Sequence, residues 1–292
     1  LVNRARRAGA MVVEGFRAIA VAGDRDATMA VAGLREDGSI VTHRSRLVVG
    51  ADGVRSAIAR SLQLTLPVRW PRRLGLVAHY EGVAGLGNTG EMHVAKDSYC
   101  GLAPQPEGLT NVALVVGLDA VRRSGLPVEA FFERSLAAMP GIAQRLHGAC
   151  RIDRVRGVGP LAQRVRRASA TGALLVGDAA GFLDPFTGEG IYKALRGAEI
   201  AADVAHTALR QGDVRSTSLA QYDQARRDAF RAKDALSLLV QMFIGATPLL
   251  EYTATRLADR PTERLLLGSA LGDCRPAREA LTPRFLWSML RP

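Results

Sequence analysis

Residues 17–33 and 38–50 alternate between apolar and polar positions, or run apolar, in short blocks typical of β-strands. Residues 1–10 indicate the end of an amphipathic helix that stops at Gly9, and we expect a strand to start at residues 11–13. Residues 17–33 and 38–50, with turns at 23–24 and 36–38, predict a small β-meander. Residues 46–52, RLVVGAD, indicate a buried parallel strand that ends at a glycine turn, and a short helix is expected over residues 54–62.

The pattern changes between residues 64 and 118, where strand-like runs are separated by turn-rich stretches without a helix. These runs are residues 75–80, 91–95, 99–103 and 111–116. They predict an antiparallel sheet that forms the floor of a substrate pocket.

The rest of the chain is mainly helical, with one further strand. The expected elements are a helix over 127–147, a short buried strand over 173–178, a Gly/Pro loop and a helix over 190–209. Prolines at 248, 261, 276 and 283 would separate the helices that follow.

Composition excludes several classes of protein. With 292 residues, of which 48% are hydrophobic, the chain can bury a full core, so wholesale disorder is excluded. The formal net charge is +11, but the arginines are dispersed in pairs without interleaved aromatics, so no nucleic-acid partner is expected. Attraction to anionic membrane surfaces remains open.

The cysteines indicate a reducing compartment. Cys100, Cys150 and Cys274 are isolated and odd in number, so they predict neither a zinc site nor a disulfide scaffold. The five histidines lack metal-ligand spacing, and no metal site is predicted. The opening LVNRARRAGA lacks the apolar region of a signal peptide, so a cytoplasmic location is expected, with peripheral membrane contact left open.

One apolar run is long but interrupted. Residues 236–250 contain Gln241 and Pro248, which make the run too short to span a bilayer. Packing in the core is the most frequent use of such a run, and lining a lipid tunnel or grazing a membrane are the alternatives.

Two motifs follow buried strands. The first, GADGVRS at residues 50–56, places Asp52, Gly53 and Arg55 in a turn directly after a strand. Ligands in α/β sheets bind beyond the carboxyl ends of strands, although an Asp-Gly pair is also common in ordinary turns. The first motif alone is therefore a weak signal.

The second motif, GDAAGFLDPFTGEGI at residues 177–191, is more specific. The Asp178 carboxylate at a strand end can accept hydrogen bonds from sugar or polyol hydroxyls. The small residues after it allow a ligand to approach the backbone, and Gly188 and Gly190 allow a flat ring to lie against it. A helix that starts near Gly190 favours an anion at its N-terminus, such as the negative edge of a reduced flavin.

Both motifs resemble the DG and GD motifs of flavin-dependent oxidoreductases with the glutathione-reductase-type FAD domain. That group includes p-hydroxybenzoate-hydroxylase-like monooxygenases, flavin halogenases and geranylgeranyl reductases. The resemblance implies that Asp178 contacts the ribityl chain, with close backbone approach at Gly177, Ala180 and Gly181. It implies that the isoalloxazine is lined by Pro185, Gly188, Glu189, Gly190 and Ile191, and that the pyrophosphate region is supported by Asp52, Gly53 and Arg55.

The DPFTGEG form of residues 184–190 is similar to the geranylgeranyl-reductase-related branch. Aromatic hydroxylases usually carry His at the position of Gly181. Residues 99–104, YCGLAP, loosely resemble the substrate-domain strand YxWxFP of that branch, with Gly101 and Ala103 in place of Trp and Phe. This likeness implies substrate contacts by Tyr99, Cys100 and Pro104.

A second glycine pattern, GLGNTG at residues 85–90, matches GxGxxG but precedes a strand-like run instead of a helix. A phosphate site needs a helix N-terminus behind its glycines, so we interpret this segment as a hairpin loop. The family's own GxGxxG belongs to a first βαβ unit that would precede residue 1. We therefore expect a fragment or a degenerate gene product.

The resemblance and the pattern together predict an α/β fold. It would comprise an N-terminally incomplete parallel-sheet FAD domain, an inserted antiparallel substrate sheet and a helical C-terminal segment. The expected boundaries are 1–66 and 161–212 for FAD binding, 67–160 for substrate binding and 213–292 for the C-terminal helices.

The resemblance implies an FAD-dependent oxidoreductase. NAD(P)H would be the electron donor, and a hydride would pass from reduced flavin to an unsaturated, apolar and prenyl-like small molecule. The alternatives are a monooxygenase that hydroxylates an aromatic or polyketide-like ring, and a non-catalytic remnant that acts as a scaffold.

Overall fold

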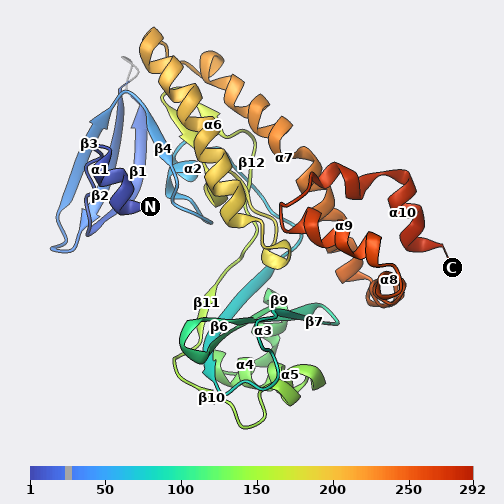
Figure 1. Ribbon diagram of the computed structural model, residues 1–292. Coiled ribbons are helices and arrows are strands. Elements are labelled where there is room, and N and C mark those ends of the chain that lie inside the picture. The colour runs from blue at the N-terminus through green and yellow to red at the C-terminus, as the bar shows by residue number, and fades with distance from the viewer. Residues whose placement is uncertain (24–27, 292) are drawn as a thin grey trace. The chain divides into compact units, whose positions relative to one another are not determined.

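The computed structural model describes residues 1–23 and 28–291 of the chain (Figure 1). Its helices and strands form two compact units. Unit 1 comprises residues 1–66, 163–181 and 191–228, and unit 2 comprises residues 67–162, 182–190 and 229–292. The mixture of helices with parallel and antiparallel strands confirms the predicted α/β class.

Unit 1 begins with a short helix, α1 (Val2–Arg7), and an antiparallel meander. Its strands are β1 (Phe16–Gly23), β2 (Met29–Arg35) and β3 (Ile40–Ser45), in that order in the sheet. The predicted meander is thereby confirmed, although Asp24 of the expected 23–24 turn lies outside the described residues. The strand expected at residues 11–13 is wrong: these side chains are exposed, and pairing with β2 starts only at Phe16.

The parallel strands predicted by the two apolar runs are present. The strand β4 (Val48–Gly50) pairs in parallel with β14 (Ala173–Leu175), which also pairs with β13 (Ser169–Ala170). The helix α2 (Ala57–Ser61) follows β4, and a separate two-stranded ladder joins β5 (Thr65–Leu66) to β12 (Arg164–Val165). The parallel pairing places the residues after β4 and after β14 at the same end of the sheet.

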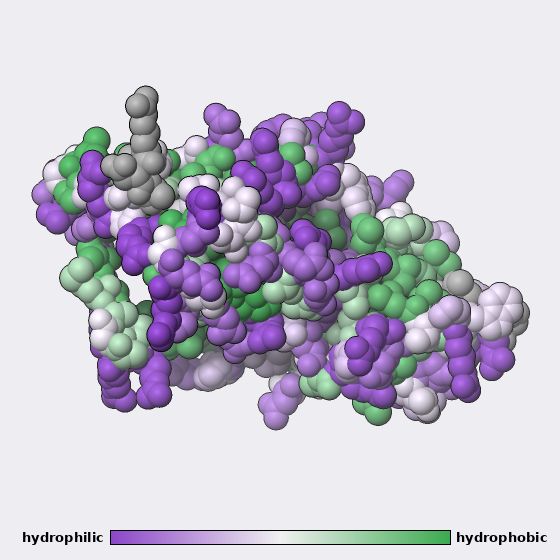
Figure 2. Space-filling view, turned by 90° about the horizontal axis from the view of Figure 1, so that it is seen from above, coloured by the Kyte–Doolittle hydropathy of each residue, from purple (hydrophilic) through white to green (hydrophobic). Residues whose placement is uncertain are grey.

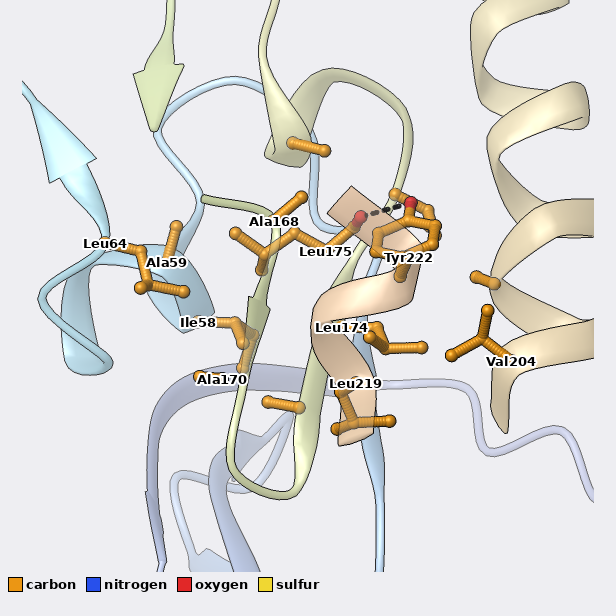
Figure 3. Packing of buried hydrophobic residues seen from close by; sticks show 14 of the residues in the cluster. Ile58, Ala59, Leu64, Ala168, Ala170, Leu174, Leu175, Val204, Leu219 and Tyr222 are labelled. Carbon is orange, nitrogen blue, oxygen red and sulfur yellow. Dashed lines mark hydrogen bonds between the residues drawn. The ribbon is translucent and has the colours of Figure 1, made fainter. Parts of the chain in front are cut away.

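Helices pack on this small sheet to form the core of unit 1. Figure 3 shows Leu174 of β14 beside Val204 of α6 (Gly190–Gln211) and Leu219 of α7 (Ser216–Gly245). The hydroxyl of Tyr222 donates a 2.7 Å hydrogen bond to the carbonyl oxygen of Leu175. This bond pairs a buried hydroxyl and so removes the cost of burying it.

Unit 2 contains the predicted antiparallel sheet. Its long strands are β6 (Arg73–Glu81), β7 (Glu91–Ala95), β8 (Ser98–Pro104) and β9 (Leu109–Gly117). The sheet order is β10-β6-β9-β8-β7, and the short strands β10 (Cys150–Arg151) and β11 (Arg156–Val158) both pair with β6. Since β6 and β7 are not neighbours, residues 85–90 do not form the predicted hairpin loop; they connect an inner strand to an edge strand.

Helices pack on one face of this sheet. They are α3 (Leu118–Ser124), α4 (Val128–Ala137) and α5 (Pro140–Arg145), with Phe132 and Ile142 fully buried in the shared core. Residues 127–147 are mainly helical, as predicted, but in two helices, because Met139 adopts an extended conformation and Pro140 begins a new helix. Proline fits the first turn of a helix but cannot continue one.

The C-terminal part of unit 2 is helical, as predicted. After α7 come α8 (Thr247–Ala258), α9 (Pro261–Leu271), the 3₁₀ segment η4 (Ala277–Leu281) and α10 (Pro283–Leu290). Prolines occupy the first turn of α8, α9 and α10, so they begin these helices. Among the described residues no single helix has the length and apolar composition to cross a membrane; α7 and α8 meet that test only as a pair bent by 114°.

Candidate functional site

The second motif starts at the carboxyl end of β14. The amide of Val176 continues the parallel ladder by donating to the carbonyl of Gly50, and residues Gly177–Ala180 then form the 3₁₀ turn η2. Asp178 in this turn is half-buried. Burial raises the pKa of the Asp178 carboxyl, and the positive charge of Lys193 on α6 partly opposes the rise. Within the described part of the chain, no protein group donates a hydrogen bond to this carboxylate, so a ligand's hydroxyl would stabilise it.

The first motif forms a capped turn after β4. The Asp52 carboxylate accepts hydrogen bonds from the Ser56 hydroxyl at 2.5 Å and from the amides of Ala57 and Ile58 at 2.6 and 3.2 Å. Gly53 and Arg55 both adopt positive φ angles, of 72° and 62°. Asp52 therefore stabilises the start of α2 and the shape of the turn.

A residue that the sequence analysis missed joins the two motifs. The side-chain carbonyl of Gln163 accepts the backbone N–H groups of Arg55 and Ser56, and its amide donates to the Ala179 carbonyl at 2.7 Å. Gln163 is buried, and it lies 107 residues from Ser56 along the chain. Nothing in the local pattern around Gln163 marks this role.

The backbone of the second motif leaves room for a ligand. A Cβ atom added at Gly181 would meet only the main-chain carbonyl oxygen of Gln163, at 3.8 Å. A Cβ atom added at Gly188 would meet no heavy atom within 4 Å. Ala179 and Ala180 are buried and carry no bulk beyond a methyl group. Within unit 1, open space at Gly181 and an acceptor carboxylate on Asp178 fit the polyol chain of a cofactor.

In unit 2, Asp184 anchors the loop that follows. Its carboxylate accepts hydrogen bonds from Arg73 Nη1 at 2.8 Å, Gln241 Nε2 at 2.9 Å, the Tyr99 hydroxyl and the Phe186 amide. Both Asp184 and Arg73 are buried, so removal of either side chain would leave the other charge buried without its partner. The loop is therefore tied to β6, β8 and α7.

The far end of the same loop is also attached to α7. Glu189 is buried and accepts a 2.6 Å hydrogen bond from the Ser237 hydroxyl. Ser237 and Gln241 are one helical turn apart, so α7 holds residues 184–190 at both ends. Pro185 and Gly188 between these anchors are exposed, Gly190 is half-buried, and Ile191 after the loop is exposed.

The three predicted substrate contacts lie on β8. The Tyr99 hydroxyl is directed at Asp184, and burial together with the negative charge of Asp184 raises the pKa of Tyr99. Cys100 is fully buried in the core shared with α4 and α5, and burial raises the pKa of its thiol to about 12. Pro104 is half-buried at the strand end.

An apolar cavity of about 140 Å³ lies among the C-terminal helices of unit 2. It is lined by Phe186, Leu236, Leu239, Val240, Phe243, Leu250, Thr253, Ala254, Leu257, Leu267, Leu271, Phe285 and Met289. Five residues of the predicted apolar run therefore line this space.

These features fit a flavoprotein of the class that binds FAD beyond the strand ends of an α/β domain. Residues 1–235 match the family model described as FAD binding domain. The chain belongs to this family, which confirms the predicted class of flavin-dependent oxidoreductases and FAD as the cofactor of the family.

Named relatives include both reductases and halogenases. The chain is 32% identical to digeranylgeranylglycerophospholipid reductase 2 of Methanothermobacter thermautotrophicus, over 78% of this chain and 57% of the relative. It spans about half to three fifths of the curated relatives that it matches.

Two solved structures illustrate the likeness in fold. The flavin-dependent halogenase CmlS shares 27% identity, with a TM-score of 0.69 over 79% of this chain and 43% of that one. A geranylgeranyl bacteriochlorophyll reductase-like protein from Thermoplasma acidophilum shares 23% identity, with a TM-score of 0.69 over 82% and 60% of the two chains, and this match shows the fold alone.

Proposed function

We propose that this chain carries the flavin and substrate machinery of an FAD-dependent reductase that acts on an unsaturated, prenyl-like substrate. Bound FAD would supply the hydride for such a reduction, with NAD(P)H as the donor that recharges it. The observation that carries the proposal is the half-buried Asp178 carboxylate at the end of β14, beside backbone that leaves open space at Gly181. The named reductase relative supports the choice of a prenyl substrate.

The chain's own residues would bind and orient the cofactor. We propose that Asp178 accepts hydrogen bonds from the ribityl chain, while Gly177, Ala180 and Gly181 allow close approach. Pro185, Gly188, Glu189, Gly190 and Ile191 would line the isoalloxazine. The Asp52 cap and the positive φ angles of Gly53 and Arg55 would hold the turn that supports the pyrophosphate region.

The substrate would meet unit 2. We propose that the substrate lies against β8, the strand that carries Tyr99, Cys100 and Pro104. Tyr99 would act through its hydrogen bond to Asp184. We also propose peripheral contact of a cytoplasmic protein with membranes. Figure 2 shows hydrophobic residues over the C-terminal helices. In these helices the side chains of Leu265 and Trp287 are about 70% exposed. The net charge of +11 favours contact with an anionic surface.

An oxygen-dependent monooxygenase is the second candidate, and the 27% identity to the halogenase CmlS favours keeping it. Hydroxylation of an aromatic or polyketide-like ring requires oxygen, whereas reduction of a double bond does not. Product analysis with and without oxygen separates the two: product formed only in air would favour the monooxygenase.

The absorbance spectrum of the purified protein tests the proposal. We expect a yellow protein, or one that gains thermal stability on addition of FAD. The change Asp178→Ala removes charge-assisted hydrogen bonds that contribute roughly 1.5–3 kcal/mol each, so the Kd for FAD should rise roughly 10- to 150-fold. The exposed Asp203 on α6 offers a matched control, and Asp203→Ala should retain flavin.

A colourless protein with no response to FAD would favour the non-catalytic scaffold. An Asp178→Ala variant that binds FAD as tightly as the parent would overturn the site assignment.

A further inference from the structure

The apolar cavity of unit 2 has the character of a binding site for hydrocarbon. Thr253 is the one residue with a polar side chain in its described lining, and its hydroxyl donates within α8 to the carbonyls of Leu249 and Leu250. No lining side chain therefore requires a polar partner. The inner wall includes the buried Leu236 and Phe285, whereas Ala254 is exposed and marks the mouth.

The cavity is connected to the anchored loop through a single aromatic side chain. Phe186 lines the cavity, and its ring meets the ring of Tyr99 edge-on, with centroids 5.0 Å apart and planes at 89°. Tyr99 in turn donates its hydroxyl to Asp184, the anchor of residues 184–190. Edge-to-face pairs have a preferred geometry, so a displaced Phe186 ring disturbs the Tyr99–Asp184 contact.

The helix α7 provides a second connection. Its residues Leu236, Leu239 and Val240 line the cavity, while Ser237 and Gln241 on the same two turns hold Glu189 and Asp184. A ligand that pushes on this stretch of helix therefore acts on both ends of the loop.

We infer that, given the flavin site proposed above, this cavity binds the end of an isoprenoid chain and that Phe186 transmits its occupancy to residues 184–190. The volume suits one five-carbon unit, because an apolar cavity of about 150 Å³ is known to accept benzene. Phe186 is thus a positioning residue: it adjusts the predicted ring-lining loop when the substrate chain is in place.

The test uses the full chain without flavin, with 2-methyl-2-butene and benzene as probes. Each probe should raise Tm by about 2–4 °C at tenfold its Kd. Each should also change the hydrogen–deuterium exchange of residues 184–190. The change Ala254→Phe closes the mouth and should abolish both effects, whereas Ala258→Phe, one turn along α8 at an exposed position outside the lining, should leave both intact.

The role of Phe186 is tested separately with Phe186→Leu, which keeps the lining apolar but removes the ring. This variant should still gain stability from the probes, while the exchange of residues 184–190 responds clearly less than in the parent, because only the connection through α7 remains. The inference is overturned if the parent does not respond to either probe, or if Phe186→Leu transmits the response unchanged. Because no flavin is present, these outcomes are independent of the FAD spectrum that tests the proposed function.

Discussion

The side-chain amide of Gln163 donates a 2.7 Å hydrogen bond to the main-chain carbonyl of Ala179, while its carbonyl accepts the Ser56 amide at 3.2 Å. One buried side chain thus joins the turn after β4 to the turn after β14. Parallel pairing brings the two turns to the same edge of the sheet, and Gln163 then fixes their separation. The two motifs act as one structural element.

We predict that Gln163→Leu weakens both the fold of unit 1 and flavin binding. The substitution leaves the buried Ser56 amide and the Ala179 carbonyl without this partner, which costs about 1–3 kcal/mol of unfolding free energy. The Kd for FAD should rise roughly tenfold, because the turn that carries Asp178 loses its support. Urea unfolding and fluorescence titration with FAD measure the two effects, and Gln144→Leu at an exposed site on α5 is the control. Unchanged stability in Gln163→Leu would contradict the bridging role.

We predict that breaking the buried ion pair of Arg73 and Asp184 strongly lowers stability, and that removing both charges restores part of it. Arg73→Met leaves the Asp184 carboxylate buried without its charged partner, and this costs about 3–5 kcal/mol. The double variant Arg73→Met/Asp184→Leu removes both charges and should recover a substantial part of that loss. The exposed pair of Arg196 and Glu199 is a matched control, since Arg196→Met should change stability by less than about 1 kcal/mol. A double variant as unstable as the sum of the single ones would contradict this coupling.

We predict that Asp178 makes the stability of the flavin-free protein depend on pH. Its pKa is raised by burial, so the folded state binds this proton more readily than the unfolded state. The resulting stability is fully present below the unfolded pKa and is lost as pH rises through the folded pKa. The difference in unfolding free energy between the parent and Asp178→Asn, measured from about pH 3 to about pH 8, should follow this trend. A difference that is constant across this range would contradict it.

The same carboxylate should make flavin binding depend on pH in the opposite direction. Hydrogen bonds from ribityl hydroxyls favour the ionised form of Asp178, so FAD affinity should fall as pH falls through the raised pKa. The affinity of Asp178→Asn should be weaker and lack this dependence. Fluorescence titrations at several pH values measure it.

The sequence predicts those features of the fold and of the site that depend on residues close together in the chain. The runs before Asp52 and Asp178 are recognisable as buried strands because apolar residues and glycine turns are adjacent in the chain. The Arg73–Gln241 contact, between residues 168 positions apart, depends on the packing of β6 against α7 and leaves no local signal. The hairpin error at residues 85–90 has a similar cause, since a turn-rich loop looks the same whether it joins neighbouring or distant strands. The domain boundaries, the site residues and NAD(P)H stay predictions.

Two glycines of the second motif should respond differently to the same substitution. Gly177 has a φ of +56°, and an added Cβ would lie 3.3 Å from the Cβ of Ala194 on α6, whereas Gly188 has a φ of +69° and open space around it. Both alanine variants incur backbone strain of about 1–2 kcal/mol. Gly177→Ala should lose about 1 kcal/mol more, because α6 must shift to accept the methyl group.

For flavin binding we expect the opposite ranking, with Gly188→Ala more affected than Gly177→Ala. The methyl group of Gly188→Ala projects into the space proposed for the flat ring, so the Kd for FAD should rise more than the loss of unfolding free energy alone explains. Chemical unfolding without flavin and FAD titration of the folded variants provide the two measurements. If Gly188→Ala binds FAD like the parent while remaining folded, the ring does not lie against this part of the loop.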